Sequence, residues 1–141
     1  MPSFDVEKTA ITVFEIDGLY LFKQYFDEDG LFQELEDYYN SERYRFEVPG
    51  DDIQETSQTL NDYFYELKLA ENPADYCAVI DKDADASDIM RNAVASQKHR
   101  DCVIFLLKDK ISLRQAKEHG AISLEKSEID KEVLRWKTDG S

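Results

Sequence analysis

The sequence has few of the residues that usually mark a nucleotide site, a metal site or a disulfide framework. Its 141 residues include five glycines, two cysteines and two histidines. Neither Gly-x-Gly-x-x-Gly nor a phosphate-loop motif occurs, so we do not expect a glycine-rich loop that cradles a nucleotide. Cys77 and Cys102 fall in separate apolar runs. We therefore expect two buried free thiols and no disulfide.

Long apolar runs are also lacking. The longest are short, as over residues 102–107, whereas a membrane-spanning helix needs ~18 or more apolar residues. Residues 1–8 contain no basic region followed by an apolar core, so a secretory signal is not expected. The sequence thus favours a cytoplasmic protein that has no membrane partner.

Positive charge is scarce in the first half of the chain. Residues 1–75 hold 19 Asp and Glu against five Lys and Arg, whereas residues 76–141 hold 12 of each. The whole net charge of −14 therefore belongs to the first half. Nucleic acid is not expected to bind this half directly, because phosphate contacts need clustered Lys and Arg.

The acidity of the first half has three interpretations. It can be a solvated surface that keeps the chain soluble. It can reflect a halophilic protein, adapted to a salty cytoplasm, in which the acidity has no binding role. It can also be a docking face for a basic partner, since opposite charges attract across an interface.

Strand signals alternate with helix signals along the chain. Apolar and β-branched runs predict strands over residues 10–16, 43–48, 76–80, 102–107 and 121–124. Helical spacing of apolar residues predicts helices over residues 21–26, 31–39, 52–69, 85–97, 113–119 and 127–136.

This alternation predicts the fold class. We expect one α/β domain over residues 1–141, with two or three layers and a mainly parallel sheet of about five strands covered by helices. The alternative is a ferredoxin-like α+β fold.

An acidic run directly follows one of the predicted strands. Asp81 and Asp83 stand two residues apart there, and both can reach one hard cation such as Mg²⁺. Glu15 ends the first predicted strand. This pattern resembles the Toprim-like domains over roughly residues 10–110, although the glycine that follows the Glu comes two positions later than is usual. The resemblance implies that Glu15, Asp81 and Asp83 hold Mg²⁺ for nuclease-type phosphoryl transfer.

The same acidic run also has a purely structural interpretation. Asp83, Asp85 and Ser87 precede a predicted helix. Side chains of these types cap helix N-termini and complement the positive end of the helix dipole. In that case the run needs no metal ion.

A second candidate is the aromatic and acidic segment over residues 22–39. Tyrosine-rich surfaces make good protein contacts, although many of these rings are also suited to a core. The candidate interaction residues are Tyr25, Glu34, Glu36, Asp37, Tyr38 and Tyr39.

No complete catalytic group of residues accompanies these features. A Gly-x-Ser-x-Gly motif is absent, and His99 and His119 lie near predicted helix ends beside basic residues. We therefore expect a non-enzymatic interaction or regulatory module that needs no cofactor. It would bind a protein partner, or itself, through its acidic first half.

Overall fold

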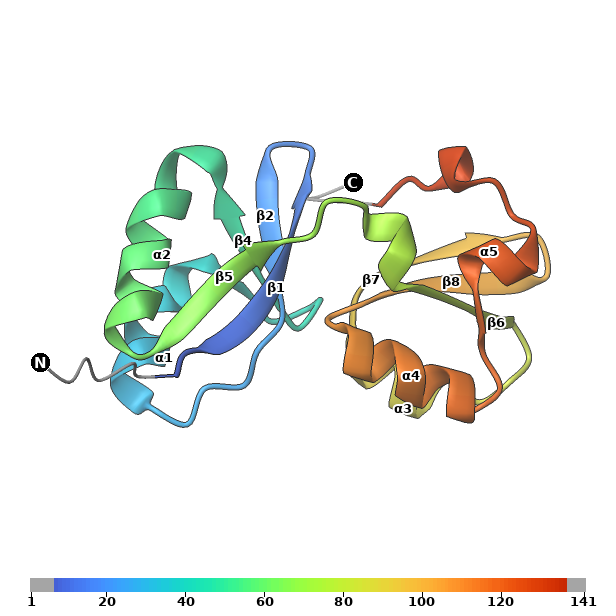
Figure 1. The fold of residues 1–141 in the computed structure, drawn as a ribbon, viewed down its shortest axis with the longest axis horizontal. Helices are drawn as coiled ribbons and strands as arrows, with labels where there is room; N and C mark the ends of the chain where they lie inside the picture. Colours follow the sequence, from blue (N-terminus) through green and yellow to red (C-terminus); the bar gives the residue numbers. More distant parts are fainter. Residues whose placement is uncertain (1–6, 137–141) are drawn as a thin grey trace, which may run out of the picture.

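The computed structural model describes residues 7–136, which form two β-sheets (Figure 1). The first sheet has the strand order β3-β4-β2-β1-β5, and its strands are β1 (Thr9–Ile16), β2 (Leu19–Phe22), β3 (Tyr39–Asn40), β4 (Arg45–Pro49) and β5 (Tyr65–Leu69). Strands β1 and β5 are parallel, and the other neighbours are antiparallel. Helices α1 (Asp29–Leu35) and α2 (Ile53–Asp62) cover one face of this sheet (Figure 1). The 3-10 turns η1 (Glu36–Tyr38) and η2 (Gly50–Asp52) complete this half.

The second sheet is antiparallel throughout, in the order β7-β8-β6-β9. Its strands are β6 (Cys77–Asp81), β7 (Ala93–His99), β8 (Cys102–Leu107) and β9 (Ile122–Ser123). Helices α3 (Ser87–Arg91) and α4 (Lys110–Glu118) lie on one face (Figure 1). The turns η3 (Pro73–Tyr76) and η4 (Lys131–Val133) and the short helix α5 (Leu124–Ser127) complete the described chain. No helix within residues 7–136 has the length and apolar character needed to cross a membrane.

A tight turn joins the first two strands. Asp17 and Gly18 both adopt positive φ angles, 53° and 83°. A two-residue turn with this backbone matches the twist of antiparallel strands, and an Asp-Gly pair favours it. The chain therefore returns along β1 as β2 instead of entering a helix.

Within residues 7–136, three apolar clusters form the core. One lies between the first sheet and its helices, and includes Val13, Phe22 and Leu60. Another lies between the second sheet and helices α3 and α4. The third draws residues from both sheets, among them Phe14 and Ile104, so the two sheets pack against each other.

Among the described residues, the side chains of Arg45 and Lys23 cross the junction between the sheets. Arg45 on β4 is 1% exposed. Its Nε donates to Glu47 Oε2 at 2.7 Å and its Nη1 donates to the Val94 carbonyl at 2.9 Å. Lys23, which follows β2, donates from Nζ to the Ala93 carbonyl at 3.1 Å. Both acceptor carbonyls belong to β7, so the first sheet is hydrogen-bonded to an edge strand of the second.

The predicted mainly parallel sheet is wrong, and an α+β class describes the structure better. The described residues contain two sheets, mostly antiparallel, with one parallel pair. The helix predicted over residues 52–69 ends at Asp62 and is followed by β5, and the one predicted over 85–97 ends at Arg91 and is followed by β7. Residues 21–22 end strand β2, and residues 23–26 are irregular instead of helical. Strand β2 forms a hairpin with β1 and β7 forms one with β8, whereas β5 makes the parallel pair with β1.

Candidate functional site

The three carboxylates of the predicted metal site lie on different elements. Glu15 is on β1, paired in register with Tyr20 of β2, and its hydrogen bond raises the pKa of Tyr20. Asp81 ends β6, and Asp83 lies in the turn that follows. Within residues 7–136, no three His, Cys, Asp or Glu side chains are grouped so that they could hold a metal ion. The structure therefore does not bring Glu15 together with Asp81 and Asp83.

The carboxylates of the acidic run accept hydrogen bonds from their own loop. The amide of Asp83 donates to Asp81 Oδ1 at 2.9 Å. The amide and hydroxyl of Ser87 donate to Asp85 Oδ1 at 3.1 and 2.7 Å. The Ser87 bonds lower the pKa of Asp85. These local bonds are typical of Asx turns, and they shape the entry into α3.

The predicted interaction residues on α1, η1 and β3 are of two kinds: exposed acids, and partly buried tyrosines whose rings contact neighbouring residues. Glu34, Glu36 and Asp37 are exposed on α1 and η1. Burial, with a hydrogen bond from its hydroxyl to Asp52 Oδ2 at 3.2 Å, raises the pKa of Tyr38. Tyr39 packs edge-to-face on Phe46, with ring centroids 5.0 Å apart.

An open hollow of about 420 Å³ lies beside these residues, and we call it the acidic hollow. None of the described residues that line it is Lys or Arg. Arg45 neutralises one of its acids, Glu47, through a 2.7 Å contact, whereas Asp37 and Glu42 are exposed. Its lining residues are Asp37, Tyr38, Tyr39, Asn40, Ser41, Glu42 and Glu47.

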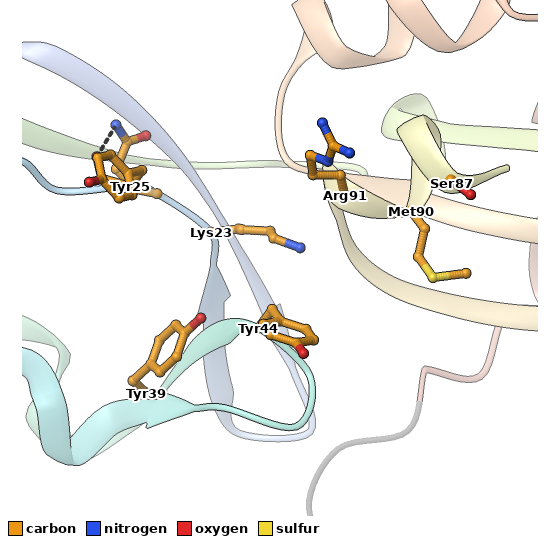
Figure 2. Close-up of a pocket in the computed structure, with 8 residues that line it drawn as sticks. Lys23, Tyr25, Tyr39, Tyr44, Ser87, Met90 and Arg91 are labelled. Atoms are coloured by element: carbon orange, nitrogen blue, oxygen red, sulfur yellow. Dashed lines mark hydrogen bonds between the residues drawn. The ribbon is translucent and has the colours of Figure 1, made fainter.

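A second cavity, of about 490 Å³, lies where the two halves of the chain meet, and we call it the junction cleft. Figure 2 shows Tyr39 and Tyr44 on the side of the first sheet, Met90 and Arg91 on the side of α3, and Lys23 between the two sides. The cleft is lined by Lys23, Gln24, Tyr25, Tyr39, Tyr44, Ser87, Met90 and Arg91.

Three apolar or aromatic side chains that line the junction cleft are unusually exposed for their type. Tyr25 is 84% exposed, Tyr44 64% and Met90 59%. Single exposed apolar residues are common on protein surfaces, but several around one cavity often mark a binding surface. The junction cleft is therefore the strongest candidate for a ligand site in the described chain.

The charge of the junction cleft is opposite to that of the chain. Lys23 and Arg91 line it, and no Asp or Glu is among its described lining residues. It continues into a cavity of about 380 Å³ that also takes in Arg43, Arg45 and one acid, Glu42. Three of the five Lys and Arg of residues 1–75 thus line one continuous opening. Burial, helped by the nearby Lys108, lowers the pKa of Lys23.

Only part of these two surfaces is predicted from the sequence. Tyr25 and Tyr39 of the predicted interaction residues line the junction cleft, but Lys23, Tyr44 and Arg91 were missed. The sequence does contain a signal for the cleft. Residues 1–75 have very few Lys and Arg, and most of these lie close to tyrosines in the sequence. The contribution of α3 was not visible, because only the tertiary fold brings it to the tyrosines.

Searches against protein-family models, curated proteins and solved structures found no match for this chain. Its function therefore has to be inferred from the geometry and charge of its own surfaces.

Proposed function

We propose that the chain is a non-enzymatic interaction module, and that a basic segment of a protein partner docks on the acidic hollow and the neighbouring acids of α1. The observation that carries this proposal is the composition of the hollow, in which exposed carboxylates and tyrosine rings occur together without a lining Lys or Arg. Three of the residues predicted from the sequence, Asp37, Tyr38 and Tyr39, line it.

The chemistry of the hollow suits a Lys or Arg side chain. Asp37 and Glu42 offer exposed carboxylates to its charge. Tyr39 offers a ring that its packing on Phe46 holds in place, and cations bind favourably over aromatic faces. An exposed ion pair contributes only ~0.2–1 kcal/mol, so the partner has to present several basic residues.

The net charge of −14 supports the same proposal kinetically. Complementary charge steers association and raises the rate of encounter, most strongly at low ionic strength. Binding is therefore expected to weaken as salt is added, since the Debye length falls from ~10 Å at 0.1 M to ~3 Å at 1 M.

Reversal of the exposed acids tests the proposal. Partners are captured with the wild-type chain and identified, and their affinity is remeasured with purified proteins. The triple variant Glu34→Lys, Glu36→Lys and Asp37→Lys should weaken binding by about tenfold or more, because three attractive contacts become repulsive.

The matched control makes the same change of charge elsewhere. Glu118, Glu125 and Glu128 are exposed in the second half, and their replacement by Lys should leave affinity within about threefold of the wild type. Equal loss in both triple variants would show only an effect of net charge. Unchanged binding by the α1 variant would refute the docking face.

A further inference from the structure

We infer that the junction cleft is a small-molecule site for a planar organic anion, namely an aromatic carboxylate. This inference goes beyond the proposed function, because it concerns a different cavity with the opposite charge. The volume of about 490 Å³ falls within the ~300–1,000 Å³ of ordinary ligand pockets. Such pockets are frequent where two structural units meet, and this one lies between the first sheet and α3.

The walls of the cleft favour a flat ring. Tyr25, Tyr39 and Tyr44 line one side of it, and the Met90 thioether lies on the other (Figure 2). Aromatic pairs attract in stacked and edge-to-face arrangements, and methionine sulfur adds favourable contacts with aromatic rings. A planar group between the walls would cover Tyr44 and Met90, which are 64% and 59% exposed without it.

The charged groups of the cleft favour an anion. Lys23 Nζ donates to the Ala93 carbonyl at 3.1 Å, and an ammonium group has three donors, so two remain for a ligand. Arg91 lies on the side of α3, and its guanidinium can form a paired contact with a carboxylate. Its contact with Asp88 is long, at 3.9 Å between exposed side chains.

The environment of Lys23 points the same way. Partial burial and the nearby Lys108 lower the pKa of Lys23, so both destabilise the protonated, charged form of its side chain. A bound carboxylate would offset this destabilisation by direct attraction. No Asp or Glu is among the described residues that line the junction cleft itself, and Glu42 lines only the adjoining cavity.

A pair of ligands that differ only in charge provides the test. 2-Naphthoate and 2-naphthamide share one ring system, and their binding can be followed by amide chemical shifts in two-dimensional NMR of the full chain. Naphthoate should bind with a Kd between about 10 µM and 1 mM, as expected for a ligand of its size. It should bind about tenfold more tightly than naphthamide, and the shifts should concentrate on the cleft.

Two variants separate the ring contact from the charge contact. Tyr44→Ala should weaken both ligands by about threefold or more. Arg91→Ala should weaken naphthoate by about threefold to fivefold and leave naphthamide unchanged. Both residues are exposed, so neither change should unfold the chain.

Matched controls carry the same changes on other surfaces. Phe64 and Lys68 are an exposed ring and an exposed cation that do not line the cleft. Phe64→Ala and Lys68→Ala should each leave naphthoate binding within about twofold. Equal affinity for the two ligands, shifts outside the cleft, or equal loss in cleft and control variants would overturn the inference.

The test is independent of the protein-docking proposal. The triple Lys variant of Glu34, Glu36 and Asp37 alters a surface that shares only Tyr39 with the cleft. It should retain naphthoate binding even where it loses its protein partner. Naphthoate that fails to bind the wild type would refute the cleft site and leave the acidic hollow untouched.

Discussion

Arg45 is a buried charged residue that joins the two sheets by a hydrogen bond. Its guanidinium is almost fully buried, and it bonds both Glu47 of its own strand and the Val94 carbonyl of β7. A buried charge is tolerated only when it is paired and hydrogen-bonded. Loss of the guanidinium would leave the Glu47 carboxylate and a buried carbonyl without these donors.

Arg45→Ala should therefore destabilise the fold strongly. Removal of one partner of a buried ion pair costs about 3–5 kcal/mol, and the free energy of unfolding in urea measures it. Arg114→Ala, an exposed change on α4, should cost less than about 0.5 kcal/mol. A loss below about 1 kcal/mol in Arg45→Ala would show that the junction does not need this residue.

This role of Arg45 is not predictable from the sequence. Arg45 belongs to a run in which polar and apolar residues alternate, and this pattern predicts that the polar side chains of residues 43–48 face solvent. In the structure, however, β4 lies between β3 and β2, and the side chain reaches a carbonyl 49 residues away. A partner at that separation leaves no mark on local periodicity.

At the scale of the elements, the boundary between α2 and β5 shows why one long helix was predicted. Phe64 adopts φ 67°, the left-handed conformation that ends many helices. Glycine usually occupies such a position because other residues are strained there. Because Phe64 and not glycine occupies this position, the sequence has no signal that the helix ends there, and the helical spacing of apolar residues continues into β5.

Phe64→Gly should raise stability as a result. Relief of the left-handed strain is worth about 0.5–1 kcal/mol, and Phe64 is 53% exposed, so little packing is lost. The midpoint of thermal unfolding should rise by a few degrees. Phe64→Ala keeps the strain and should not stabilise. A gain in the alanine variant equal to that in the glycine variant would contradict this explanation.

The elements that were predicted correctly are those with strong local signals. The strands expected over 10–16 and 102–107 are confirmed as β1 and β8, because the first is rich in β-forming residues and the second is apolar throughout. Strand β7 was missed because residues 93–99 have little apolar content after Val94. Its pairing with β8 makes it a strand. The junction cleft could not be predicted either. Its two walls lie more than 40 residues apart in the sequence and meet only in the tertiary fold.

At the scale of the whole molecule, the charge and the shared core should govern unfolding. Trp136 is 9% exposed within the cluster that both sheets share, so its fluorescence reports on the junction. We expect one transition, coincident in fluorescence and circular dichroism, because the sheets share that core. Its midpoint should rise with KCl up to about 0.5 M and then level off, as repulsion within the acidic half is screened.

Two other outcomes would change this description. Separate transitions would show that residues 1–141 do not unfold as the single domain predicted from the sequence. A midpoint that climbs steadily into molar KCl would support salt adaptation, and the acidity would then need no partner. A matched series in sodium sulfate, which strengthens apolar burial, distinguishes general salt effects from a specific need for KCl.

The order of the two sheets along the chain also has a consequence for synthesis. Strand β5 ends at Leu69, and the second sheet does not begin until Cys77. A ribosome that adds ~5–20 residues per second needs roughly 2–8 s to pass from the end of β5 to the end of β8. During those seconds the sheet face that carries Phe14 and Leu21 has no second sheet to cover it. The acidic half is made first, so mutual repulsion keeps neighbouring nascent chains apart while this apolar face is open.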